Sequence, residues 1–433
     1  MTHFEYYKLF YDNFFLYMLL LLLCSFPFYK IWNKYTYTWF DPLRITIFTN
    51  IFTTTVVFFL YLTKQIEAGI FIQFITSIVV FWLAFIIFAK RQPSYSSKTM
   101  NNYGELAFIL FILFLALFIS LTSLTYFLLG IPLLANTRLE TYAGSGLGVF
   151  GRLIPFFKTY CLFYSFYMWD SCKKINVIKF FLIFVFFIFI VTGILSGSRS
   201  SFFQLIFVFW GYHHFYKRDT QQLARYYRFL ILAVLVSIMS FSIKSEFFNF
   251  IGAANKFILR AISSGDNYYM ALPNNIIANV DIGIWYKHLF YGLLGPLRII
   301  NGDSVPPPVG YQLTWLTNPG IYGLATGPLS SPPLLGYIYF GWGGVFFSLI
   351  IGIFCSFAIF KLPYMLPRGV ITSSISFYLY SSIIAFIGDV CLGMGYLFDT
   401  ILNIIFVVVI LFGVFLIGIL YPKQFYSRDN AER

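Results

Sequence analysis

The residues best suited to chemistry form a short run, Ser196-Gly-Ser-Arg-Ser-Ser201, between two apolar segments. Gly197 permits a sharp turn there, and Ser198 or Ser200 can cap the start of the following helix. The free N–H groups and the dipole of that helix start would face the same space as the guanidinium of Arg199. This combination suits the binding of a phosphate or pyrophosphate. The alternative is a plain hairpin whose arginine reaches lipid headgroups.

A second group of polar residues surrounds the start of an apolar segment at 147–168. Arg138 and Glu140 precede this segment, and Arg152 and Lys158 fall within its first three turns. Charges at that depth in a membrane are costly and often functional, although Arg152 can equally extend to the interface. The nearby Gly-x-Gly-x-x-Gly pattern follows no predicted strand, so close helix packing explains its glycines better than a dinucleotide site does.

A third group lies in the polar stretch that follows residue 243. It supplies Arg260, Asp266, His288 and Arg298 from separate short elements. Basic groups brought together from separate elements can bind a pyrophosphate from several sides. Asp266, His288 and Glu140 are the candidate general bases. The alternative is a solvated loop with ordinary charges.

The composition places these groups in a membrane protein. The chain has 433 residues, of which 59% are hydrophobic and 10% are charged, whereas soluble domains carry about 25% charged residues. Retention of Lys and Arg on the cytoplasmic face explains the net charge of +13 without a nucleic-acid partner. Five scattered cysteines and four histidines form neither a disulfide framework nor a metal-ligand pattern. We therefore expect no metal and no cofactor.

The apolar segments predict an all-α polytopic integral membrane protein with about eleven transmembrane helices, in a range of ten to twelve. They are 14–29, 45–62, 70–89, 106–130, 147–168, 177–195, 201–216, 229–243, 334–360, 370–390 and 400–421. One set of alternate connections carries seventeen Lys and Arg residues, and the short connections of the other set carry three. This asymmetry places the N-terminus in the periplasm and the C-terminus in the cytoplasm.

Residues 1–433 are expected to form a single membrane domain that contains one long periplasmic loop, 244–333. Loops of that length are usually functional, and its short apolar runs predict short helices on the membrane surface. The segments 201–216 and 229–243 are too short to span about 30 Å of hydrocarbon. They either begin below the membrane surface and leave an outward-facing cavity, or have boundaries displaced by a few residues.

The order of these features resembles the O-antigen polymerases, the Wzy-type repeat-unit polymerases. The resemblance rests on the run Ser196–Ser201 between apolar helices and on the long outer loop after it. The Gly323–Gly344 stretch, which leads into an apolar helix, and the segment Arg138-Leu-Glu-Thr-Tyr142 before a basic helix start are also similar to that family. Together these features cover roughly residues 130–360.

The resemblance implies a glycosyltransferase of the bacterial inner membrane. Such an enzyme moves a glycan from undecaprenyl pyrophosphate onto the non-reducing end of a newly flipped lipid-linked repeat unit. Its expected partners are undecaprenyl-pyrophosphate-linked oligosaccharide and membrane lipid, with a chain-length regulator and a flippase of the same pathway. Arg199 and Arg298 would hold the pyrophosphate, supported by Arg152 and Arg260 and by the other polar residues of the three groups, Arg138, Lys158, Ser198 and Ser200.

Two other functions fit part of the pattern. An O-antigen ligase uses the same donor with a lipid A-core acceptor, and it also suits an arginine cluster and a histidine in a long outer loop. A lipid-linked oligosaccharide flippase predicts repeated halves and charged residues near mid-membrane, where Asp389 is the clearest acidic candidate. A purely structural or sensory protein explains neither the loop nor the outer arginines.

The pyrophosphate role of Arg199 has a direct test. We expect Arg199→Ala to abolish long polysaccharide because the departing pyrophosphate loses a fixed positive donor. The variant should still insert in the membrane, and the single repeat unit should still be made. Lipopolysaccharide banding measures the outcome, and normal long chains in the variant would remove Arg199 from the site.

Overall fold

Helices dominate the part of the chain that the computed structural model describes. This part comprises residues 1–89, 104–134, 148–172, 177–197, 201–219 and 250–420, with the single positions 223, 228, 231 and 235, and it contains no strand. Eight helical segments within it are long and apolar enough to cross a membrane. The chain is therefore an all-α polytopic membrane protein, as the sequence predicts. The total of eleven spans and their orientation stay predictions.

The helices fall into two sequence groups on either side of the long loop. The first group is α1 (His3–Asp12), α2 (Phe14–Tyr35), α3 (Pro42–Leu62), α4 (Ala68–Phe85), α5 (Gly104–Leu129), α6 (Gly148–Ser171), α7 (Val177–Leu195) and α8 (Ser201–Gly211). The loop holds α10 (Phe250–Ile262), α11 (Asp266–Ala271), α12 (Trp285–Leu294) and α13 (Val309–Thr317). The second group is α14 (Pro332–Phe340), α15 (Gly344–Phe360), α16 (Val370–Gly388) and α17 (Val390–Leu420).

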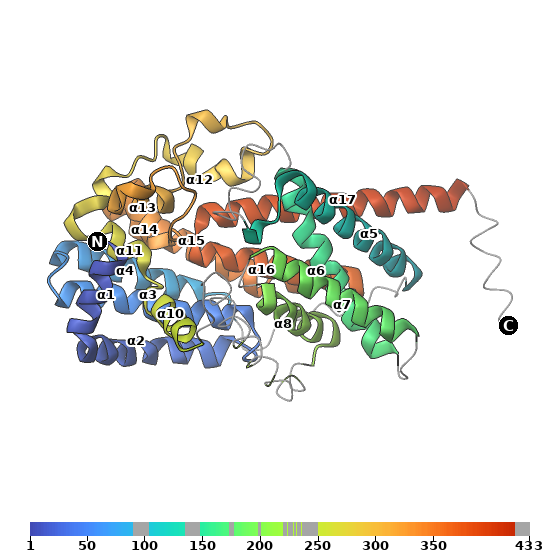
Figure 1. Cartoon of the computed structure of the whole chain (residues 1–433), viewed down its shortest axis with the longest axis horizontal. Coiled ribbons are helices and arrows are strands. Elements are labelled where there is room, and N and C mark those ends of the chain that lie inside the picture. Colours follow the sequence, from blue (N-terminus) through green and yellow to red (C-terminus); the bar gives the residue numbers. More distant parts are fainter. Residues whose placement is uncertain are drawn as a thin grey trace.

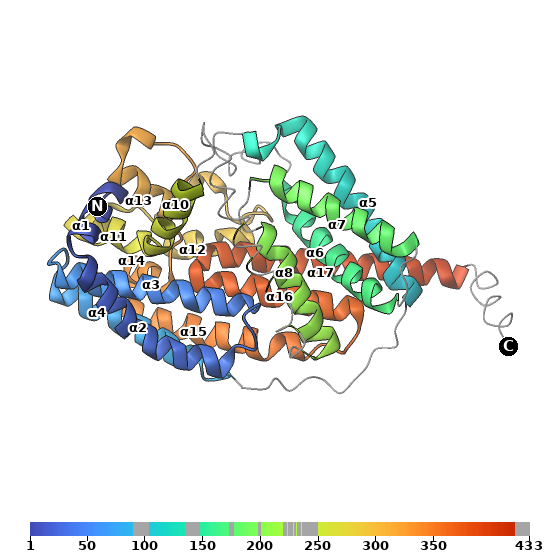
Figure 2. The ribbon, with the colours of Figure 1, turned by 60° about the horizontal axis from the view of Figure 1, so that its bottom comes forward.

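The molecule is elongated, with its two ends built from different helices. In both ribbon views α1–α4 and α15 lie at one end and α5–α7 lie toward the other, with α8 and α16 between them; α17 runs from the middle of the molecule out past α5 (Figure 1, Figure 2). The closest helix partners are α15 with α4, α16 with α17, α12 with α17, and α5 with α6. The long loop is thus tied to the end that carries α1 and to the central helix α17.

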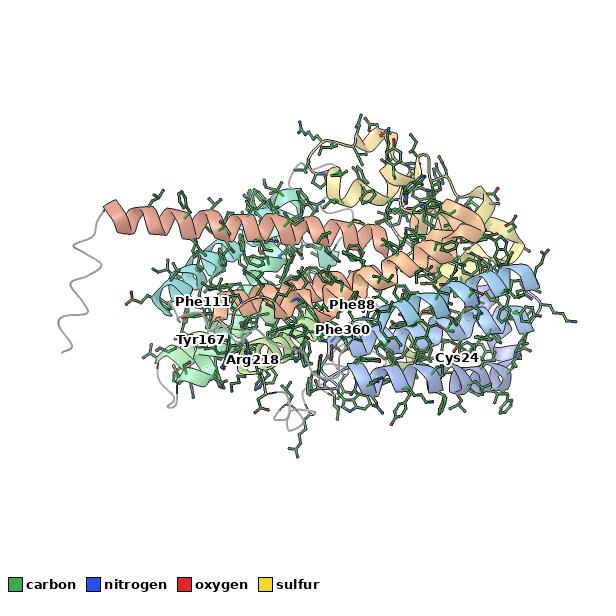
Figure 3. All side chains as sticks on the ribbon, turned by 180° about the vertical axis from the view of Figure 1, so that it is seen from behind. Cys24, Phe88, Phe111, Tyr167, Arg218 and Phe360 are labelled. Atoms are coloured by element: carbon green, nitrogen blue, oxygen red, sulfur yellow. The ribbon has the colours of Figure 1, made fainter. Side chains whose placement is uncertain are left out.

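The contact between α4 and α15 shows how apolar helices pack in this chain. A Cβ on Gly352 would lie 2.6 Å from the carbonyl oxygen of Phe81, so only glycine allows this approach. Aromatic rings fill the other end of the same interface, where Phe85 and Phe360 have centroids 5.4 Å apart. Phe88, labelled with Phe360 in Figure 3, contacts the ring of Phe357 in α15 with centroids 6.0 Å apart. Small residues and rings together hold α15 against α4.

The predicted span 334–360 consists of two helices joined by a 3₁₀ turn, Gly341–Gly343. Gly341 has a φ of +56°, which glycine adopts without strain. At the break, the carbonyl oxygen of Gly341 accepts from the amide of Gly344 and retains capacity for a second donor. The buried side chain of Gln73 in α4 donates to that oxygen at 3.1 Å. Broken helices are tolerated in membranes when a neighbouring helix satisfies the freed backbone in this way.

Other boundaries also differ from the sequence prediction. The last span begins at Val390 in place of residue 400, because α17 starts immediately after Asp389. Helix α8 is short, as predicted, and continues as a π-helical turn, Tyr212–Lys217. The segment 229–243 lies almost wholly outside the described residues, so the outward-facing cavity expected there stays a prediction.

The long loop contains short helices, as the sequence predicts, and two of its segments cross closely. A Cβ on Gly310 in α13 would overlap the carbonyl oxygen of Pro328, and one on Gly327 would overlap the carbonyl oxygen of Gly310. The glycines therefore let the backbone of the segment before α14 lie in direct contact with the backbone of α13. This crossing fixes the position of α13 relative to the membrane helices that follow.

We expect Gly310→Ala to destabilise this crossing because the added methyl group meets backbone that cannot move freely. Overpacking of this kind typically costs ~1–3 kcal/mol. Gly320→Ala is the matched control, since a Cβ there would only make an ordinary 3.5 Å contact with Asn318. Thermal unfolding of the purified full chain in detergent measures both variants. Equal midpoints for the two variants would contradict the crossing.

Candidate functional site

A polar cleft lies where α1 meets the long loop. It has a volume of about 450 Å³ and is bounded by the start of α1, by α10 and α11, and by α13 with the segment that follows it. Figure 1 shows the N-terminal end of the chain beside α11 and α13. The polar side chains on its walls are Thr2, His3, Arg260, Asp266, Thr314, Thr317, Asn318 and Thr326. Hydroxyl and amide groups that both donate and accept are suited to a ligand rich in hydroxyl groups.

The charged part of the cleft is an ion pair between two loop helices. Arg260 in the last turn of α10 donates from Nη1 to the Oδ2 of Asp266, the first residue of α11, at 2.5 Å. The Asp266 side chain is 9% exposed and that of Arg260 is 55% exposed. The Asp266 carboxylate raises the pKa of Arg260. The guanidinium is thus held by a buried partner while much of its surface stays available to an anion.

The turn between α10 and α11 packs against helix α3. Gly265 lies directly on Val56 of α3, where an added Cβ would approach the valine side chain to 2.7 Å. The amide of Asp266 donates to the carbonyl of Ser263 at 3.0 Å. Because this turn rests on α3, the Arg260–Asp266 pair has a defined place relative to the membrane helices. The sequence predicted both residues as site residues, and the structure brings them together.

Two further groups in or beside the cleft, His3 and Tyr269, escaped sequence reasoning. The Nδ1 of His3 lies 2.5 Å from the hydroxyl oxygen of Tyr269, which is fully buried in α11. The two residues are 266 positions apart in the chain. The available signal was indirect: the charge asymmetry of the connections placed the first residues and the long loop on the same side of the membrane.

Arg152 lies outside the cleft and has a partner of its own. Its Nη1 contacts the Oδ1 of Asp399 in α17 at 2.5 Å, and its guanidinium carbon lies 5.3 Å from the ring centroid of Phe398. The side chains of Arg152 and Asp399 are 30% and 11% exposed. An ion pair between two helices satisfies both charges, so Arg152 joins α6 to α17. Both ribbon views place α6 away from α11 and α13 (Figure 1, Figure 2).

Lys158 is buried in α6, with 8% of its surface exposed, and is not part of the cleft. No hydrogen bond or ion pair joins it to any residue within the described ranges. Its neighbour Thr159 accepts a hydrogen bond from the Gln204 side chain of α8 at 3.3 Å. The first turns of α8 therefore pack against α6 at Thr159, and the role of Lys158 in a basic site stays a prediction.

His288 links three elements and is buried away from the cleft. Its Nδ1 lies 2.6 Å from the Tyr339 hydroxyl and 3.7 Å from the Cys391 sulfur, and the ring also bonds the carbonyl of Pro307. Burial lowers the pKa of His288. The observed contacts of Nδ1 join α12 to α14 and α17.

The remaining predicted site residues divide by location. Arg298 is exposed in the turn after α12, with a φ of +58°, and does not line the cleft. Arg138, Glu140, Ser198, Arg199 and Ser200 lie outside the described residues. At the two ends of the same run, Gly197 has a φ of +62° and α8 begins at Ser201. The chain therefore turns at Gly197 as predicted.

Comparison with the families of known proteins, with curated proteins and with solved structures finds no match to this chain. Within the described ranges, no three His, Cys, Asp or Glu side chains gather closely enough to hold a metal ion. The chemistry of the cleft must therefore be read from its own side chains.

The Arg152–Asp399 pair gives a test of whether Arg152 is structural. Asp399→Asn should lower the free energy of unfolding by about 1–3 kcal/mol, the usual contribution of a hydrogen bond to a charged group. Adding Arg152→Gln should cost less in this background than alone, because the two residues act together. Chemical unfolding of the four chains of this double-mutant cycle in detergent measures the coupling. Additive effects would show that the pair does not stabilise α6 against α17.

Proposed function

We propose that this chain polymerises oligosaccharide repeat units linked to undecaprenyl pyrophosphate, at the periplasmic face of a bacterial inner membrane. The observation that carries the proposal is the cleft between α1 and the long loop. It combines an exposed guanidinium, a buried carboxylate and a wall of hydroxyl and amide groups, and it is built directly on membrane helices. The resemblance to the O-antigen polymerases supports the same reading.

The cleft is suited to a glycosyl donor substrate that carries both a charged pyrophosphate and a sugar. Arg260 retains N–H donors beyond the one that contacts Asp266, and these can bind pyrophosphate oxygens. As the glycosidic bond to phosphate breaks, negative charge grows on the leaving oxygen. A positive donor that is already fixed in place can lower such a barrier by ~3 kcal/mol. Thr314, Thr317 and Asn318 would hold sugar hydroxyls beside it.

The apolar helices supply the second requirement of a lipid-linked substrate. Helices α2, α3 and α4 present exposed apolar side chains, such as Leu23, Phe48 and Val79, that only lipid can cover. Helix α3 also carries the α10–α11 turn, through the contact of Val56 with Gly265. A substrate anchored in the membrane by its polyprenyl tail can therefore approach the cleft laterally. A chain-length regulator and a flippase of the same pathway remain proposed partners.

The decisive experiment uses the purified full chain in liposomes with a synthetic polyprenyl-pyrophosphate-linked repeat unit. We expect a ladder of polymer for the unaltered chain. Arg260→Ala should slow polymerisation about 100-fold or more, the typical effect of removing one positive or hydrogen-bonding donor to a developing anion. Lys256→Ala is the matched control, since it removes an exposed positive charge from the same helix but not from the cleft.

A deletion strain separates the competing functions. One repeat unit on each lipopolysaccharide core supports a polymerase, whereas cores without any repeat unit favour a ligase or a flippase. In the liposome assay, equal rates for Arg260→Ala and Lys256→Ala would detach the function from this cleft.

A further inference from the structure

Helix α1 is fastened to the long loop by aromatic contacts. The rings of Tyr6 and Tyr269 stack with centroids 4.0 Å apart and planes 8° from parallel. The hydroxyls of Tyr6 and Tyr17 both donate to the carbonyl of Ile262, at 3.4 and 3.2 Å. All three tyrosines are fully or almost fully buried. Such packing fixes the position of α1 against α10 and α11, so its first residues cannot move independently of the cleft.

The first turn of α1 is also fixed internally. The Thr2 hydroxyl accepts from the Glu5 amide, and the Glu5 carboxylate accepts from the Thr2 amide. This reciprocal arrangement is a capping box, which stabilises the start of a helix. His3 lies inside the capped turn and lines the cleft. Its backbone is therefore held while its side chain remains exposed.

The His3 imidazole has one nitrogen engaged and one available. Its Nδ1 is hydrogen-bonded to the buried hydroxyl of Tyr269 at 2.5 Å, and its ring stacks on Tyr7 with centroids 6.3 Å apart. Within the described residues, nothing is hydrogen-bonded to Nε2. When Nδ1–H donates to Tyr269, the Nε2 lone pair is free to accept a proton from a ligand in the cleft.

Partial burial of the His3 ring against the neighbouring tyrosines favours its neutral form. Burial lowers the pKa of His3, while Asp266 raises it and Arg260 lowers it to smaller extents. Tyr269 from α11 and Tyr7 from α1 also face the ring, and the wall from α13 adds hydroxyl and amide groups only. A neutral imidazole at neutral pH is the form that a general base requires.

We propose that His3 is the general base of the cleft, an inference that rests on the proposed polymerase function. The acceptor sugar hydroxyl gives its proton to Nε2 of His3 as its oxygen forms a bond to the anomeric carbon of the donor. The bond between that carbon and the phosphate oxygen breaks, and polyprenyl pyrophosphate leaves with the bonding pair. The imidazolium then returns its proton to water or to the released pyrophosphate.

The other candidate bases fit this role less well. Asp266 is 9% exposed, and its Oδ2 already accepts from Arg260. His288 is buried, contacts Tyr339 through Nδ1, and does not line the cleft. His3 is exposed and lines the cleft, and its Nε2 has no hydrogen bond to any described residue.

The test compares His3→Gln with Lys8→Gln in the liposome assay. Lys8 is exposed on the same helix and does not line the cleft. We expect His3→Gln to lower kcat by about 100- to 10,000-fold, the usual range for loss of a general base, with little change in KM. The unaltered chain should lose rate as the pH falls below the ordinary histidine range, since protonated His3 cannot accept a proton. That acidic limb should be missing from the residual rate of His3→Gln.

Each outcome bears on one claim. No polymer from the unaltered chain at any pH overturns the polymerase function itself. Polymer from the unaltered chain, together with full activity or an unchanged acidic limb in His3→Gln, overturns the base assignment and leaves the function standing. A thermal midpoint of His3→Gln equal to that of Lys8→Gln excludes loss of fold as the cause of lost rate, whereas a clearly lower midpoint makes His3 structural and also overturns the assignment.

Discussion

Charged and backbone polar groups in this chain must find partners inside the protein, because hydrocarbon offers none. The buried carboxylate of Asp41 accepts from the amides of Tyr37 and Leu43 and from the Tyr380 hydroxyl, and so ties the start of α3 to α16. Asp389 similarly accepts from the amides of Ser330 and Leu392, and joins the end of the long loop to the junction of α16 and α17. The Gln73 side chain satisfies the break before α15. Each polar tie joins segments distant in sequence, so the same constraint that limits charge also fixes the fold.

The cleft follows from this constraint. Irregular backbone is possible only where protein or water covers it, and the long loop gathers such backbone above the membrane helices. Gln312 shows how the loop is held: its side-chain amide donates to the carbonyls of Asp281 and Pro307 and accepts from the amide of Asp281. These hydrogen bonds hold the loop in one conformation. Donor groups on a rigid loop can stay at the positions where negative charge develops during the reaction.

The sequence predicted the helices well because apolar runs of about 20 residues are an unambiguous signal of membrane spans. It predicted Arg260 and Asp266 because they belong to a group of polar residues in the long loop. It could not place His3, because the contact with Tyr269 depends on a chain reversal across most of the protein. Nor could it separate Arg152 from a ligand-binding arginine, since the partner Asp399 lies 247 residues away. Pairing between distant helices is a tertiary property, and neither periodicity nor spacing carries it.

An arginine that is already paired is better suited to a leaving pyrophosphate than a free one. A lone guanidinium would attract any phosphate headgroup in the membrane, whereas the carboxylate of Asp266 reduces that general attraction. The planar fork of Arg260 can keep Nη1 on Asp266 and offer its other N–H groups to the ligand, so binding needs no reorganisation of the side chain. Charge that grows on the leaving oxygen then strengthens the second contact without breaking the first. The buried position of Asp266 at the start of α11 keeps this geometry constant, and the same helix carries Tyr269, which is hydrogen-bonded to His3.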